Sequence, residues 1–336
     1  MTQKVIVTTT INKPTQALLK FINFKDWDVV IVGDLKTPHN LYYELQNNNS
    51  NVKYLSPTFQ EDNYKELSDS IGWCVVARRN IGLKYAYDNK YIIIATVDDD
   101  NYPYDNWGQN ILVGKEIEVD IYDTNNLVFE PLSVTNYKHL WHRGYPIELV
   151  NDRHNNIYLG KKKIKILIQA DLWDGHPDID AMSRLQYNNP IVKFDIKEPY
   201  TSTKIVPFNS QNTFIHRSVL PYYCVLAYTD RMDDIWGGYL CQHILKDKLP
   251  FVVFNKASVY QDRSCHVWEP VKTDNLIDTY NIVKCSHLTD LKREIMGYDW
   301  TFKFLNNLKD YEEILNSVDK KITLFLKEYF KLKDNF

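Results

Sequence analysis

The segment Tyr91-Ile92-Ile93-Ile94-Ala95-Thr96-Val97-Asp98-Asp99-Asp100 is an apolar, β-branched run that ends abruptly in three adjacent carboxylates. Such a run predicts a buried strand. The three like charges repel one another, and a divalent cation with oxygen ligands is the simplest group that would offset this repulsion. Because ligands of α/β folds bind at the carboxyl ends of strands, the segment predicts a site for a metal and a phosphate-bearing substrate. The alternative is an Asp-rich turn ahead of Asn101 and Pro103.

The hundred residues around this segment alternate between strand and helix patterns. Buried strands are predicted at 4–10, 28–34 and 52–55, and helices at 14–24 and 64–88. The second helix is expected to be interrupted near Gly72 and again at 80–82. This alternation predicts a parallel sheet with right-handed crossovers. No GxGxxG follows the first strand and no GxxxxGK[ST] occurs in the chain, which disfavours a dinucleotide-binding Rossmann domain and a P-loop kinase.

Composition narrows the class of protein. The 336 residues are 44% hydrophobic and 25% charged, as is usual for a soluble globular protein. The net charge of −3 gives no basic field that would attract nucleic acid. No segment approaches the roughly 18 consecutive apolar residues of a membrane span. The odd number of cysteines, without CxxC spacing, and an N-terminus without a signal-peptide core favour a reducing compartment, so we expect a cytoplasmic protein.

Several motifs stand in a fixed order along the chain. They are Val32-Gly33-Asp34-Leu35-Lys36-Thr37-Pro38, Arg78-Arg79-Asn80-Ile81-Gly82-Leu83-Lys84-Tyr85-Ala86 leading into Val97-Asp98-Asp99-Asp100-Asn101, Arg143-Gly144-Tyr145-Pro146, Asp171-Leu172-Trp173 with Pro177-Asp178-Ile179-Asp180-Ala181, and Asp233-Asp234-Ile235-Trp236-Gly237-Gly238-Tyr239. Over roughly residues 4–270 this set resembles the STELLO-type glycosyltransferase-like proteins. It also resembles the reversibly glycosylated polypeptide family, whose plant members are UDP-arabinopyranose mutases.

The resemblance implies an α/β fold of the GT-A type, with a mixed central sheet flanked by helices. It implies one catalytic domain over 1–285, with a nucleotide-binding half at 1–105 and an acceptor half at 106–285. Residues from about 288 to 330 lie outside the resemblance and alternate apolar and charged residues at helical spacing, which predicts C-terminal helices and a helical extension at 286–336. The implied donor is a nucleotide sugar, UDP-linked in the mutases, used with Mn²⁺ or Mg²⁺. The acceptor is an unknown glycan or small molecule, and a homo-oligomer is possible because the mutase relatives assemble.

The acid cluster supplies the predicted metal contacts. Alternate residues of an extended backbone point the same way, so Asp98 and Asp100 can share one cation while Asp99 faces the sugar. Metal-using GT-A enzymes commonly add a histidine from the second half of the chain, and the resemblance makes His266 the candidate. A histidine of a surface loop is the alternative for His266.

The nucleotide-sugar contacts are predicted from the other strand ends. The candidates are Thr8 and Thr10 for the base or ribose, Asp34 for the uracil N3–H, Lys36, Arg78 and Arg79 for the diphosphate or ribose, and Trp173 and Trp236 for stacking on the sugar. Solvent exposure is the alternative for Lys36, and a place in the core is the alternative for each tryptophan.

Three residues are predicted to act on the acceptor side. The resemblance places Asp233 and Asp234 where GT-A enzymes often hold the base that takes a proton from the acceptor hydroxyl. Asp234 could instead only cap a helix. The glycines that follow Trp236 would let the backbone approach a ligand. Arg143 is the position that the mutase family links to reversible self-glycosylation, which leaves a UDP-sugar mutase as one alternative to a glycosyltransferase and a non-catalytic sugar-nucleotide-binding scaffold as another. The motif continues here as Ile147-Glu148, which departs from the plant pattern.

Overall fold

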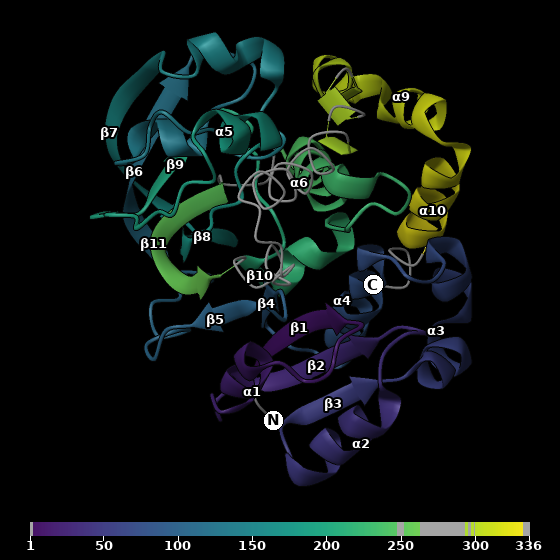
Figure 1. Cartoon of the computed structure of the whole chain (residues 1–336). Helices are drawn as coiled ribbons and strands as arrows, with labels where there is room; N and C mark the ends of the chain where they lie inside the picture. The colour runs from purple at the N-terminus through teal and green to yellow at the C-terminus, as the bar shows by residue number, and fades with distance from the viewer. Residues whose placement is uncertain (1–2, 247–251, 263–292, 295–296, 299, 332–336) are drawn as a thin grey trace, which may run out of the picture.

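A computed structural model describes residues 3–246, 252–262, 293–294, 297–298 and 300–331 of the chain. Within these residues an eleven-stranded sheet runs through the molecule, and helices lie on both of its faces (Figure 1). The protein is therefore a mixed α/β protein with a large central sheet flanked by helices, an architecture consistent with the predicted GT-A-like fold.

The first half of the chain follows the predicted alternation. Its elements are β1 (Lys4–Thr10), α1 (Gln16–Ile22), β2 (Asp28–Gly33), α2 (His39–Asn48), β3 (Val52–Leu55), α3 (Pro57–Ile71), α4 (Arg79–Asp88) and β4 (Ile93–Val97). Strands β3, β2, β1 and β4 pair in that order, all parallel. Alternate residues of β1 face opposite sides, so Val5 and Val7 pack with α3 and α4 while Ile6 packs with α1 and α2. The carboxyl ends of these strands consequently meet at one edge of the sheet.

The helix predicted at 64–88 is two helices, and only one of its predicted interruptions exists. Helix α3 ends at Gly72, whose φ of +77° suits glycine. Residues 80–82 were expected to break the pattern but lie inside α4. Gly82 is needed there for packing, because a Cβ on it would stand 2.5 Å from Cγ1 of Val7. The glycine therefore lets α4 lie close against the sheet.

The second half of the chain adds antiparallel and irregular segments. Its elements are β5 (Asn101–Pro103), β6 (Glu116–Thr124), β7 (Asn156–Lys165), β8 (Ile168–Gly175), α5 (Ala181–Gln186), β9 (Tyr200–Ser202), β10 (Asn212–His216), α6 (Asp233–Ile244) and β11 (Val252–Gln261). Short 3₁₀ helices are η1 (Val76–Arg78), η2 (Pro131–Val134), η3 (Ile147–Asp152), η4 (Arg217–Tyr222), η5 (Asp230–Met232) and η6 (Leu308–Asp310). Strand β10 lies antiparallel between β4 and β8 and so joins the two halves into one sheet.

The C-terminal helices are α9 (Tyr311–Val318) and α10 (Lys320–Lys331). Helix α10 lies beside α3, in yellow at the right of Figure 1. Phe325 and Tyr329 of α10 are buried in the same hydrophobic cluster as Val5 and Val30 of the N-terminal strands. The C-terminal helices thus share the core on one face of the sheet.

Candidate functional site

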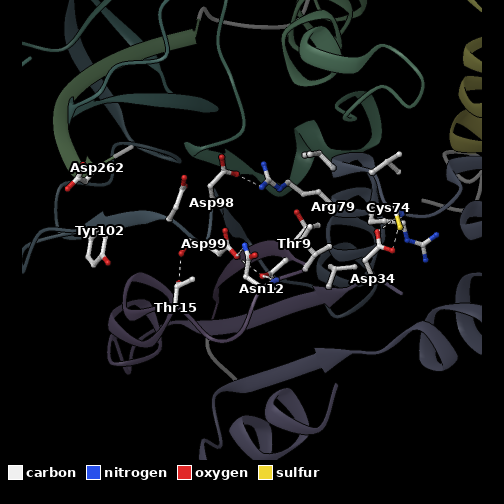
Figure 2. Close-up of a pocket in the computed structure, with 17 residues that line it drawn as sticks. Thr9, Asn12, Thr15, Asp34, Cys74, Arg79, Asp98, Asp99, Tyr102 and Asp262 are labelled. Carbon is white, nitrogen blue, oxygen red and sulfur yellow. Dashed lines mark hydrogen bonds and ion pairs between the residues drawn. The ribbon is translucent and has the colours of Figure 1, made fainter. Parts of the chain in front are cut away.

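Two adjoining cavities lie at the edge of the sheet where β1, β2 and β4 end. The first has a volume of about 520 Å³, and the acid cluster lies in its wall (Figure 2). Its lining includes five carboxylates and two guanidinium groups, those of Asp34, Asp98, Asp99, Asp100, Asp262, Arg78 and Arg79. Apolar side chains from β2 and η1 complete the wall, so the cavity offers both a charged floor and an apolar surface.

The Asp98 carboxylate is held by two side chains of the protein. Its Oδ1 accepts a hydrogen bond from Nη2 of Arg79 at 2.5 Å, and its Oδ2 accepts one from Nε2 of Gln211 at 2.6 Å. Burial would lower the pKa of Arg79, but the charge of Asp98 raises it above its usual value. An internal guanidinium group therefore balances the first carboxylate of the cluster.

The other two carboxylates of the cluster point to different partners. Oδ2 of Asp99 accepts from Oγ1 of Thr10 at 2.5 Å and from Nδ2 of Asn12 at 3.1 Å. Both oxygens of Asp100 lie 3.2–3.3 Å from Nε2 of Gln261. Thr10 is thus a hydrogen-bond partner of Asp99. Among these contacts, Asp98 and Asp100 have different protein partners.

The cavity still fits a divalent cation that is bound together with phosphates. Within the part of the chain that the structure describes, no three His, Cys, Asp or Glu side chains form a metal-binding group. Mg²⁺, however, usually takes only one or two carboxylates and completes its shell with water and substrate phosphates. With five carboxylates against two guanidinium groups, the lining has excess negative charge that a diphosphate would increase. His266, the predicted ligand from the second half of the chain, lies outside the described residues.

Arg78 is a buried cation whose hydrogen-bond acceptors are uncharged. Its guanidinium group donates to Oε1 of Gln60 at 3.0 Å, to Oγ of Ser68 at 2.9 Å and to the carbonyl oxygen of Gly72 at 3.2 Å. It also stacks over the ring of Trp73, 3.6 Å from the ring centroid. Burial lowers the pKa of Arg78 to about 10, so it stays charged at neutral pH. A fixed positive charge of this kind in a cavity wall suits an anionic ligand.

Asp34 organises the loop beside the cavity. Its two carboxylate oxygens accept from the backbone N–H of Cys74 at 2.9 and 2.8 Å, and Oδ1 also accepts from Leu35 N at 2.6 Å. This anchor holds Cys74 at a φ of +61°, which is unusual for a residue other than glycine. Two further predicted contacts lie elsewhere: Lys36 is exposed outside the cavity lining, and Thr8 is fully buried within β1.

The second cavity, of about 540 Å³, adjoins the first and shares part of its wall. Arg79 and Asp98 line both cavities, as does the segment 74–76. The predicted acceptor-side residues Arg143, Asp233 and Asp234 all line this second cavity. The predicted acceptor-side residues therefore line a space that adjoins the first cavity, and Arg79 and Asp98 lie where the two cavities meet.

Arg143 is locked between two buried carboxylates. Its Nε lies 2.9 Å from Oδ1 of Asp178, its Nη2 lies 3.1 Å from Oδ1 of Asp234, and its Nη1 donates to the carbonyl oxygen of Arg231. Burial would raise the pKa of Asp234, but Arg143 outweighs it and holds that pKa below its usual range. Burial would also raise the pKa of Asp178. The charge of Arg143 outweighs burial there as well and lowers that pKa strongly. Each of the three nitrogens of Arg143 is thus engaged in at least one hydrogen bond with the protein.

Asp233 has the opposite electrostatic environment from its neighbour. It is half-buried in the wall of the second cavity, and its Oδ1 accepts from the backbone N–H of Asp234 at 2.8 Å. Burial and the negative charge of Asp234 raise the pKa of Asp233 to about 8, although Arg143 acts to lower it. A carboxyl group that exchanges its proton near neutral pH is suited to acid–base chemistry.

Both candidate sugar-stacking tryptophans lie in the core instead. Trp173 is 4% exposed and donates from Nε1 to the carbonyl oxygen of His176 at 3.1 Å. Trp236 is 2% exposed, donates to Oγ1 of Thr301 at 2.8 Å and stacks on a phenylalanine. The predicted role of the adjacent glycines is also wrong for Gly237, because a Cβ there would meet the carbonyl oxygen of Cys224 at 1.9 Å. That glycine serves contact between backbones, and no ligand is needed to explain it.

The sequence-based reasoning missed several polar residues of the site. Ser210 and Gln211 line the second cavity, and Asn12 holds Asp99 from the loop after β1. The run Asn209-Ser210-Gln211-Asn212 was a visible signal, because four polar residues interrupt an otherwise apolar segment there. Asp178 was noticed as part of a motif, but nothing local indicated its pairing with Arg143, which lies 35 residues away in the chain.

Comparisons with known proteins bear on the STELLO-type resemblance. No family model matches the chain. It is 24% identical over 283 residues to a protein of Arabidopsis thaliana described as probable glycosyltransferase STELLO2, covering 77% of this chain and 36% of that protein. It is 25% identical over 267 residues to probable glycosyltransferase STELLO1 of the same plant, covering 73% of this chain and 33% of that protein. The chain spans about a third of the length of the curated relatives it matches.

These similarities support the STELLO-type resemblance, while the mutase-type resemblance stays a prediction. Among solved structures, A197 from STIV aligns with 76% of this chain and 82% of its own, at 10% identity and a TM-score of 0.33, a likeness too weak to support an argument. In the described residues, no helix combines the length and the apolar character required to cross a membrane.

Proposed function

We propose that this chain is the catalytic region of a glycosyltransferase that binds a nucleotide-diphosphate sugar, with UDP as the expected nucleotide, in the first cavity and an acceptor in the second. The observation that supports it best is the pair of adjoining cavities. One is lined by strand-end carboxylates and a buried Arg78, and the other contains a half-buried Asp233 that titrates near neutral pH. The similarity to proteins described as probable glycosyltransferases supports the same reaction class.

In this proposal the residues of the first cavity hold the donor. Arg78 attracts the diphosphate, and Asp34 accepts from the base through Oδ2, which has one protein donor among the described contacts. Asp100, with the substrate phosphates, holds Mn²⁺ or Mg²⁺, and a bound cation would supply charge stabilisation for the leaving diphosphate. Asp98 stays with Arg79 and shapes the cavity floor.

The second cavity holds the acceptor. Asp233 acts in its ionised form, whose share grows as pH approaches its raised pKa of about 8. It accepts the proton of the acceptor hydroxyl while the acceptor oxygen bonds to the anomeric carbon of the sugar and the nucleoside diphosphate leaves with the electrons of the broken bond. Asp234 is less suited to this role, because Arg143 and the backbone N–H of Ser210 engage both of its oxygens and its lowered pKa makes it a weak base. The structure thus favours one member of the predicted pair as the base.

A nucleotide screen by thermal unfolding tests the proposal. UDP with Mn²⁺ should raise the melting temperature by about 2 °C or more at a concentration well above Kd, because a ligand stabilises the state that binds it. Asp100→Asn should lose this shift. Asp105→Asn is the matched control, since Asp105 lies five residues further on and is 96% exposed. If no nucleoside diphosphate, with either metal, shifts the wild-type transition, the proposal is wrong.

A further inference from the structure

A chain of buried polar contacts runs from the first cavity to the second. It begins at Asp98, whose Oδ1 lies 2.5 Å from Nη2 of Arg79. Nη1 of Arg79 donates to the carbonyl oxygen of Ser210 at 2.8 Å and also to its Oγ. Ser210 then donates to Oδ2 of Asp234 from its backbone nitrogen at 2.8 Å and from Oγ at 3.1 Å. The path ends on Arg143, 3.1 Å from the other oxygen of Asp234.

The centre of this chain is held rigidly. Arg79 is 1% exposed and is the first residue of α4, the helix that packs closely on β1 and β2. The next residue, Asn80, exchanges two hydrogen bonds with the backbone of Val225, at 2.7 and 2.9 Å. The guanidinium group therefore cannot follow a displaced partner freely, and a change at one end of the chain has to be accommodated at the other.

We propose that Arg79 is a positioning residue that couples the two cavities, because the same guanidinium group fixes the donor-side Asp98 and, through Ser210, the acceptor-side Asp234. Sequence-based reasoning had placed Arg79 on the diphosphate or ribose. Its two terminal nitrogens are instead directed at Asp98, Ser210 and the carbonyl oxygen of Val97, which is 3.3 Å from Nη2. This inference rests on the proposed function in so far as a nucleotide occupies the first cavity.

The electrostatics give the coupling its physical basis. Asp98 and Asp234 are two carboxylates that both interact with one buried cation. A ligand that neutralises the negative charge of Asp98 leaves the positive potential of Arg79 at Asp234 less offset. Electrostatic interactions in a buried site are only weakly screened. Linkage is reciprocal, so a change at Asp234 must alter ligand affinity in the first cavity, whose lining does not include Asp234.

A double-mutant cycle on nucleotide affinity tests this coupling. We would measure the Kd of UDP with Mn²⁺ by calorimetry for wild type, Arg79→Lys, Asp234→Asn and the double variant. Lysine keeps the charge but loses the two-armed guanidinium group. Asp234→Asn should raise the Kd of UDP several-fold, although Asp234 lies in the neighbouring cavity. In the Arg79→Lys background the same substitution should raise the Kd by a factor that is smaller by about threefold or more.

Arg78→Lys is the matched control, because Arg78 is the adjacent buried arginine and lines the same cavity but donates to Gln60, Ser68 and Gly72. Arg78→Lys should change the Kd of UDP by the same factor with and without Asp234→Asn, so that the two effects multiply. Near-ultraviolet circular dichroism checks that each variant folds, and Ser210→Ala, which removes only the hydroxyl link, replaces any variant that does not. If the effects of Arg79→Lys and Asp234→Asn on the Kd of UDP also multiply, the coupling is overturned and the proposed function is not. Absence of UDP binding by wild type would overturn the proposed function and the coupling together.

Discussion

Adjacent acidic residues acquire different properties from their surroundings at this site. Asp234 faces Arg143, so its pKa is held below the usual range. Asp233, one residue earlier, lies on the cavity side, where burial and the charge of Asp234 raise its pKa to about 8. The sequence shows only two aspartates at the start of a helix, and their roles differ because of a residue ninety positions away in the chain.

The raised pKa of Asp233 predicts how stability depends on pH. The folded state keeps a proton on Asp233 up to about pH 8, whereas the unfolded chain releases it near pH 3.8. The contribution of this group to the unfolding free energy is therefore full at low pH and is lost as pH rises to about 8. Relative to wild type, Asp233→Asn should gain stability steadily between pH 5 and pH 8, by about 1 kcal/mol or more in total. Urea unfolding at several pH values measures the difference, and a difference that is constant with pH would contradict the prediction.

At the scale of single residues, sequence reasoning singled out aspartates that line the two cavities, Asp98 to Asp100 and Asp233 with Asp234, but not their partners. Strand ends could be identified because hydrophobic periodicity is local. The contact of Arg79 with Ser210 spans 131 positions, and no local pattern encodes it. The sugar-stacking prediction for the tryptophans failed for a related reason. A tryptophan such as Trp236 is the same letter in the sequence whether its ring faces a sugar or, as here, its Nε1 donates to Thr301.

Among the elements, α4 connects the packing of the sheet to the site. It begins at Arg79, and Gly82 one turn later lets it approach β1 and β2. Reading that glycine as a helix breaker considered only its intrinsic propensity, while the sheet beneath the helix determines its role. Strand order in the first half was predictable because strand and helix patterns alternate there. The second half was not, because β10 and β11 pair with strands that are distant in the chain.

Gly82→Ala should destabilise the protein even though alanine is the better helix former. The propensity gain is at most about 1 kcal/mol. The new methyl group, however, would stand 2.5 Å from Cγ1 of Val7 and 2.8 Å from Cγ2 of Val32, and overpacking of this kind costs about 1–3 kcal/mol. Thermal or urea unfolding should show a net loss. Adding Val7→Ala, which removes the nearest atom, should make the combined loss smaller than the sum of the two single losses. Additive losses would show that the contact with Val7 is not the cause.

At the scale of the whole molecule, the C-terminal helices are part of the main core. Tyr329 of α10 donates to the carbonyl oxygens of Leu220, at 3.2 Å, and Tyr223, at 2.5 Å, and Trp236 of α6 stacks on Phe304. Arg293 lines the second cavity, so residues near this end of the chain also reach the site. The sequence predicted a helical extension at 286–336 from its helical spacing, and amphipathic periodicity does not reveal what the apolar face contacts.

This shared core predicts that the described ends of the chain unfold together. Phe325 and Val30 are both fully buried in one hydrophobic cluster, although they lie at opposite ends of the sequence. Phe325→Ala should cost about 3–5 kcal/mol and Val30→Ala somewhat less, and both should lower the temperature of one and the same calorimetric transition. Phe24→Ala, at a site that is only partly buried against the other cluster, should shift that transition less. If Phe325→Ala instead splits off a separate early transition and leaves the main one in place, the C-terminal helices form an independent unit.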